Sequence, residues 1–178
     1  MKLLKGYYAY LAIAGGVLLR LVLPANWMMQ VVAFALISAG ALGLQTVSLW
    51  FFRASIAADV GIVFAVVCGP AVIPPGLLRI VLEYAALVPL LALGCMLLLG
   101  YAAQRRRAGQ GALAEWIVLA VWSAGIILAL LLGIGLLNEM AFHLALTAAN
   151  MLTALGHIAL IVETFRAQRE YLRTEEET

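Results

Sequence analysis

Six long apolar stretches, separated by short polar connections, constrain this chain more than any other feature. They cover approximately residues 7–24, 27–50, 55–74, 76–101, 112–137 and 139–165. A helix needs about 20 predominantly apolar residues to cross a bilayer, and the hydrocarbon requires every backbone polar group to be satisfied internally. The sequence therefore predicts an all-α integral membrane protein. Residues 1–165 form a single domain, a bundle of six transmembrane helices with short loops, and residues 166–178 form a cytoplasmic C-terminal tail.

The composition agrees with a bilayer as the solvent. Of the residues, 66% are hydrophobic and 11% are charged, with a mean hydropathy of +1.08, whereas a soluble domain is about a quarter charged. The net charge of +2 is too small to suggest nucleic acid. The partners that we expect are the lipid bilayer and either further copies of this chain or other membrane subunits.

Basic residues predict the orientation. If all six stretches cross, nine Lys and Arg side chains lie on one side and only Arg20 and Arg79 lie toward the other. The nine are Lys2, Lys5, Arg53, Arg105, Arg106, Arg107, Arg166, Arg169 and Arg173. Positive charge favours the cytoplasmic side, so both termini are expected there. No cleavage site follows the short basic N-terminus, so the first stretch is expected to remain as a span. We therefore expect a multi-pass protein located in a prokaryotic inner membrane.

The third stretch is the weakest of the six. It contains Asp59, Pro70 and the pair Pro74-Pro75, and proline breaks or shortens helices. If this stretch does not cross fully, five spans remain and the termini lie on opposite sides. The distribution of positive charge favours six.

Polar residues form a stripe along the last stretch. At 100° per residue, Glu139, His143, Asn150, Thr153 and His157 fall within about 80° of one another and span roughly 27 Å. Such groups in a membrane normally face a bundle interior, a cavity or a partner. The stripe therefore predicts a polar path or a partner surface.

Toward the outer side, five charged or titratable residues lie at similar depth and form a candidate substrate-binding cluster: Arg20, Arg79, Glu83, Glu139 and His143. Arg79 and Glu83 are four residues apart and can pair on one helix face. In one interpretation two arginines attract an anionic group into an outer cavity. In the other, the pair is structural and Arg20 extends toward the headgroups.

Toward the inner side, Gln45, Ser48, Asp59 and His157 are predicted at similar depth, and Gln45 and Asp59 are expected to meet across a short turn. Asp59, Asn150 and His157 are the candidate proton-coupling residues, because an Asp–His pair in a membrane can bind and release protons. The alternative is an interhelical hydrogen bond. Glu115 and Glu163 lie near cytoplasmic span ends and are expected to be interfacial.

Several sequence features predict no chemistry. Cys68 and Cys95 are isolated in apolar stretches and are expected to be packing residues. No enzyme or metal-binding motif is present, so we expect no catalytic residue and no bound metal. Small residues at Ala35, Ala39 and Gly43 predict close packing of the second helix.

Transport is the function that these features favour most. In outline, the length, six spans and two cytoplasmic termini are similar to the substrate-binding subunits of energy-coupling-factor vitamin transporters, a resemblance of architecture with no shared motif. The expected function is to bind or move a small, anionic solute, with proton coupling through Asp59 and His157.

Two alternatives remain open. The chain can be a non-catalytic subunit or assembly partner of a larger membrane complex, with the polar stripe against a partner helix. It can also carry haem b, because His143 and His157 are 14 residues apart, a spacing that resembles the haem-ligating pair on one helix of the cytochrome b family. No second histidine-bearing helix exists here, so no cofactor is the first expectation.

Overall fold

The computed structural model describes residues 2–69, 72–73, 76–132 and 139–176, and side chains within 6–69, 72–73, 76–132 and 142–173. These parts of the chain are helical throughout, apart from turns and short connections. The helices are α1 (Lys2–Val22), α2 (Trp27–Gly43), α3 (Leu49–Val67), α4 (Leu77–Ala85), α5 (Leu87–Arg107), α6 (Leu113–Leu132) and α7 (Glu139–Glu176). The prediction of an all-α fold is confirmed.

Four helical segments are long and apolar enough to cross a membrane: Leu49–Val67, Leu77–Arg107, Leu113–Leu132 and Phe142–Arg173. Two more apolar helices, Gly6–Val22 and Trp27–Gly43, are shorter. The chain thus has the character of a membrane protein.

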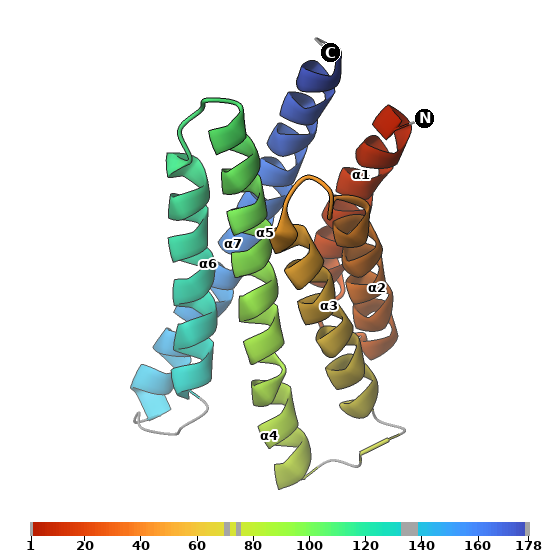
Figure 1. Cartoon of the computed structure of the whole chain (residues 1–178). Coiled ribbons are helices and arrows are strands. Elements are labelled where there is room, and N and C mark those ends of the chain that lie inside the picture. The colour runs from red at the N-terminus through yellow and green to blue at the C-terminus, as the bar shows by residue number, and fades with distance from the viewer. Residues whose placement is uncertain (1, 70–71, 74–75, 133–138, 177–178) are drawn as a thin grey trace.

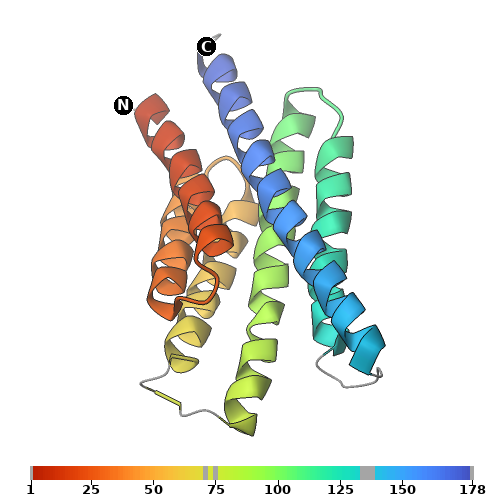
Figure 2. The same ribbon diagram turned by 180° about the vertical axis from the view of Figure 1, so that it is seen from behind.

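The chain runs back and forth along one bundle axis. Figure 1 shows the N and C termini at the same end of the bundle, together with the α2–α3 and α5–α6 connections. We call this the terminal end, and the opposite one the far end. Contacts join α1 to α2 and α7, α3 to α2 and α5, and α6 to α5 and α7. Figure 2 shows α7 crossing the back of the bundle obliquely.

The turn between the second and third helices differs from the prediction. α2 ends at Gly43, whereas the sequence predicted an end at residue 50, and α3 begins at Leu49, whereas the sequence predicted a start at residue 55. Ser48 caps α3, its hydroxyl accepting a hydrogen bond from the Trp50 amide at 3.3 Å. Gln45 therefore lies in the connecting turn. Capping by a serine side chain satisfies an amide that the helix leaves unpaired.

The weak third stretch forms an unbroken helix of 19 residues, α3. It ends at Val67, before Pro70; that proline and the Pro74-Pro75 pair lie outside the described residues. The fourth stretch, predicted as one helix, is interrupted at Ala86 between α4 and α5. Pro89 explains the interruption, because a proline ring clashes with the carbonyl four residues earlier.

Close packing of α1 on α2 involves Gly16, Gly40 and the predicted Gly43, on which a Cβ would lie 2.9 Å from the Ala9 Cβ. A Cβ on Gly16 would lie 2.5 Å from the Ala33 carbonyl oxygen, and one on Gly40 would lie 2.5 Å from that of Ala9. Ala35 and Ala39 are exposed. The predicted stripe is therefore wrong for these two alanines, since the contact face of α2 lies to one side of them.

Candidate functional site

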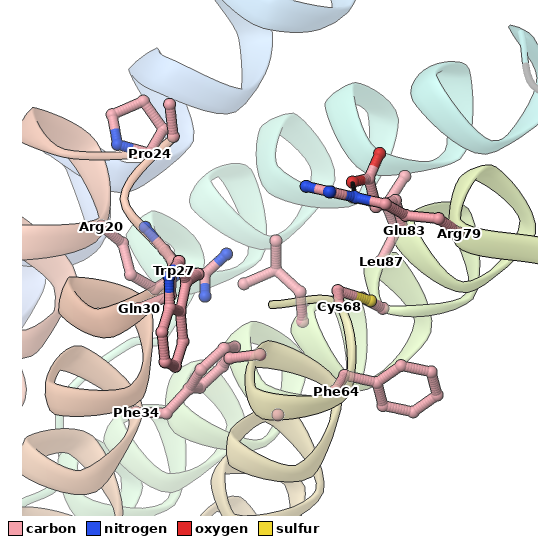
Figure 3. Close-up of a pocket in the computed structure, with 15 residues that line it drawn as sticks. Arg20, Pro24, Trp27, Gln30, Phe34, Phe64, Cys68, Arg79, Glu83 and Leu87 are labelled. Atoms are coloured by element: carbon pink, nitrogen blue, oxygen red, sulfur yellow. Dashed lines mark hydrogen bonds and ion pairs between the residues drawn. The ribbon is translucent and has the colours of Figure 1, made fainter. Parts of the chain in front are cut away.

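A cavity of about 470 Å³ lies toward the far end of the bundle, between α1, α2, α3 and the α4–α5 segment. Side chains from all of these helices line it, including Arg20, Trp27, Phe34, Cys68, Arg79 and Glu83 (Figure 3). We call it the outer pocket. The pocket brings together three of the five residues that the sequence grouped at this depth.

Arg20 provides the main polar group of the outer pocket. It sits in the last turn of α1, and its guanidinium carbon lies 4.2 Å from the centroid of the Phe34 ring. Figure 3 shows this guanidinium pointing into the space between the helices. Its Nε is buried and has no hydrogen-bond partner among the described residues. An aromatic face stabilises a cation but leaves its N–H groups available.

Arg79 and Glu83 face Arg20 from the other side of the pocket. Arg79 Nε donates to Glu83 Oε1 at 2.9 Å, so the predicted pairing on one helix face is confirmed. Among the described side chains, no carboxylate forms an ion pair with Arg20. The three charges therefore sum to one excess positive charge, carried by Arg20.

The remaining walls of the outer pocket are mostly apolar. Trp27, Phe34 and Phe64 supply aromatic surface. Gln30 adds a polar group: its Nε2 donates to the Leu23 carbonyl at 3.0 Å, while its Oε1 is buried without a described partner. The arrangement suits a ligand that has an anionic group and an apolar part.

The other two predicted binding residues are not placed in this pocket. The side chain of Glu139 lies outside the described part of the chain. His143 is exposed on α7 and does not line the pocket, and Asn150 is exposed as well. Figure 2 shows α7 crossing the bundle obliquely: near Thr153 it packs on α6 at Gly125, and near Gln168 it reaches Tyr7 of α1. A stripe on one face therefore passes from the exposed surface into the bundle.

His157 is the member of the stripe that is buried in the bundle. Its Nδ1 lies 2.7 Å from the Thr153 carbonyl oxygen, and its ring centroid lies 4.7 Å from that of Trp122. Its Nε2 is buried without a described hydrogen-bond partner. His157 is therefore held by α6 and by its own helix.

Asp59 lies elsewhere in the bundle. It is exposed on α3 and accepts a hydrogen bond from the Ser38 hydroxyl at 2.7 Å. The described contacts join Asp59 neither to Gln45 nor to His157. Asp59 lies ten residues into α3, roughly 15 Å along its axis from the turn that holds Gln45, so the predicted meeting of these two is wrong. The proton-coupling role of Asp59, Asn150 and His157 stays a prediction.

A buried ionic cluster that the sequence did not predict lies at the terminal end. Arg105 Nε lies 2.6 Å from Glu115 Oε1, and Arg105 Nη2 lies 3.6 Å from Glu163 Oε2 and 3.2 Å from Glu170 Oε1. Arg105, Glu115 and Glu163 are all buried among the helices, which the sequence did not predict; the interfacial depth of the two glutamates stays a prediction. The sequence did contain one indication: Arg105 lies two residues before the end of α5 and Glu115 two residues after the start of α6, so the two can face each other across the hairpin.

Separate hydrogen bonds also cross the terminal end. The Tyr10 hydroxyl donates to Gln104 Oε1 at 2.6 Å, and Gln104 Nε2 donates to the Ala167 carbonyl at 2.9 Å. Gln168 Nε2 donates to the Tyr7 carbonyl at 3.2 Å. These bonds join α1, α5 and α7. The terminal end is therefore tied together by polar contacts, whereas the far end contains the outer pocket.

Within the described part of the chain, no group of three His, Cys, Asp or Glu side chains is placed to hold a metal ion. No family model, curated protein or solved structure matches this chain.

Proposed function

We propose that this chain is a six-span protein of a prokaryotic inner membrane, with both termini in the cytoplasm, that binds and moves a small anionic solute. Six passes are supported by the alternating directions of α1, α2, α3, α4–α5, α6 and α7 (Figure 1). α1 has 21 residues and α2 has 17, roughly 32 Å and 26 Å of rise, so α2 alone is near the lower limit for crossing.

The orientation is supported by the distribution of arginines between the two ends of the bundle. Arg53 lies near the start of α3 at the terminal end, and Arg105, Arg106 and Arg107 end α5 there. Arg79 lies in α4, at the far end. Under the positive-inside rule the terminal end is cytoplasmic, so the outer pocket opens toward the external side.

Arg20 is the observation that carries the proposal of an anionic solute. A guanidinium in a membrane protein is costly unless it is paired. Here the guanidinium lies against an aromatic ring, keeps a buried Nε without a described partner, and points into a cavity. A carboxylate or phosphate in the pocket would supply the missing charge and accept charge-assisted hydrogen bonds.

Movement of the solute, rather than binding alone, is supported by the contrast between the two ends. The outer pocket is open, whereas the buried ionic cluster around Arg105 and the Tyr10–Gln104 bond close the terminal end. This is the arrangement expected of an outward-facing state. Passage to the cytoplasm would then require separation of α5, α6 and α7 at this cluster.

The native Cys68 lines the outer pocket and provides a direct test. In the Cys95→Ala background, the anionic thiol reagent methanethiosulfonate ethylsulfonate should react with Cys68 in intact cells about tenfold faster than its cationic trimethylammonium counterpart, because a positive cleft concentrates anions. The ratio of the two rates cancels the intrinsic reactivity of the thiol. Benzoate, as a probe anion, should slow both reactions.

Arg20→Gln should reduce the ratio of the two rates to about one, because it removes the excess positive charge. Arg53→Gln is the matched control, since Arg53 is an arginine that does not line the pocket, and it should leave the ratio unchanged. The same ratio of the two rates in the native protein and in Arg20→Gln would contradict the proposal.

A second candidate function is favoured by one observation on α7. His143 and Asn150 are exposed on a helix that is apolar enough to span a membrane, and polar groups there gain from contact with another helix. The chain can then act as a subunit of a larger membrane complex. Photocrosslinking from position 150 distinguishes the two functions: a crosslinked polypeptide supports the subunit, and crosslinks to lipid alone contradict it.

A further inference from the structure

A second cavity, of about 560 Å³, lies between α3 and α5. Its lining is apolar, with Ile56, Val60, Val88 and Ala92 among its members, except for Arg53 at one end. We call it the lateral groove. Ile56, Val60 and Val88 are each more than 40% exposed, so the groove opens on the outer surface of the bundle, where acyl chains would surround a membrane protein.

The lateral groove adjoins the outer pocket at Phe64. This residue lines both cavities, and in Figure 3 its ring points away from Arg20. On the facing segment, Ala85 lines the groove while Ala86 and Leu87 line the pocket. The boundary between the cavities is therefore formed by Phe64 on one side and by the junction of α4 and α5 on the other.

We infer that the solute of the outer pocket is a single-chain anionic amphiphile: a carboxylate head binds at Arg20, and an acyl chain passes Phe64 into the lateral groove. This inference rests on the proposed function and names its substrate class. The excess positive charge in the pocket complements the head, and the apolar groove complements the chain. From Phe64 to Arg53 the groove follows α3 for eleven residues, roughly 16 Å.

Other occupants explain fewer of these features. A small polar anion would gain nothing from an apolar groove beside its site. A helix from a second copy or a partner would fill the groove but leave the unpaired guanidinium of Arg20 without a ligand. A single amphiphile satisfies both cavities, and entry from the bilayer through the open side of the groove gives its chain an apolar path throughout.

Protection of Cys68 by carboxylates of increasing length tests the inference. The Cys95→Ala protein in nanodiscs is labelled with methanethiosulfonate ethylsulfonate in the presence of butyrate, octanoate or dodecanoate. The concentration for half-protection should fall at least about tenfold from butyrate to octanoate, because each buried methylene strengthens binding. It should fall further with dodecanoate.

Variants that fill the groove distinguish binding of the acyl chain from binding of the carboxylate head. Ala92→Leu should abolish the dependence on chain length while leaving protection by butyrate unchanged, and Ala85→Leu, nearer to Phe64, is a second variant with the same expected result. Ala154→Leu is the matched control, because Ala154 is half-buried on α7 and lines neither cavity. Because all variants are measured in identical nanodiscs, the partition of longer carboxylates into lipid is the same for each and cancels in the comparison between variants.

Each outcome decides between the two proposals. Equal half-protection by butyrate and dodecanoate would overturn the amphiphile and leave the anionic solute standing. Chain-length dependence that survives in both groove variants would also overturn it, since the chain would then lie elsewhere. Absence of protection by all three carboxylates, together with no effect of Arg20→Gln on the labelling ratio, would overturn the proposed function itself.

Discussion

Arg105 Nε lies 2.6 Å from Glu115 Oε1, although these side chains are only 3% and 2% exposed. Glu163 and Glu170 approach the same guanidinium from α7. One arginine thus compensates carboxylates from two other helices. Removing it would leave buried negative charges that repel one another, whereas removing one carboxylate would leave the arginine paired.

Arg105→Gln should therefore lower the free energy of unfolding by about 3 kcal/mol, the magnitude typical of breaking a buried ion pair from one side. Glu115→Gln should cost less, about 1 kcal/mol, because two carboxylates remain near Arg105. Unfolding in mixed micelles, followed by circular dichroism, measures both values. The neighbouring exposed Arg106 provides the control, and an equal loss in Arg106→Gln would show that net charge, not the cluster, is responsible.

The contact between α1 and α2 yields a second prediction. A Cβ on Gly40 would lie 2.5 Å from the backbone oxygen of Ala9 and 2.8 Å from Ile13 Cγ1. A backbone oxygen in a helix cannot move aside, so Gly40→Ala should separate the two helices and cost about 2 kcal/mol.

Gly15→Ala is the matched control, since it places a Cβ on α1 with no atom within 4 Å. Alanine is a better helix former than glycine, so this variant should be neutral or slightly more stable. Thermal unfolding of both proteins in the same detergent makes the comparison. The close-packing model fails if the two variants shift the midpoint equally.

The sequence was informative where depth along a span was sufficient. Arg20, Arg79 and Glu83 were grouped because each lies near the outer end of its stretch, and all three line one pocket. Depth follows from counting residues at a fixed rise per residue. Helix period and length thus predict which groups share a level of the membrane.

The sequence was less informative about which face of a helix meets which neighbour. His143, Asn150 and His157 share a face, yet only His157 is buried, because α7 crosses its neighbours obliquely. Burial of Arg105 depends likewise on α6 and α7 converging on the end of α5. Crossing angles arise from packing of many side chains, and a periodic pattern in one helix does not contain them.

Trp122 provides a third prediction, at the junction of α5, α6 and α7. Its indole is 1% exposed, and a Cβ on Gly94 or Gly156 would touch it. Trp122→Ala should cost about 2 kcal/mol from lost van der Waals contacts, less than in a soluble core because lipid is as apolar as the interior. Trp116, which is 45% exposed, should cost under about 1 kcal/mol when changed to Ala. Chemical unfolding of the two variants tests this ranking, and a reversed ranking would contradict the described packing.

The last prediction concerns the crossing of α1 and α2, which are not among the four segments described as long and apolar enough to span a membrane. In a background with Cys68→Ala and Cys95→Ala, Ala25→Cys lies in the α1–α2 connection and Gln110→Cys in the α5–α6 connection. If all six passes cross, a membrane-impermeant maleimide should label position 25 in intact cells and position 110 only after permeabilisation. Labelling of both positions only after permeabilisation would mean that the α1–α2 hairpin does not cross, and Arg20 would then face the cytoplasm. Labelling of position 110 alone in intact cells would invert the orientation. The reaction at position 25 therefore decides whether the outer pocket can receive a solute from outside.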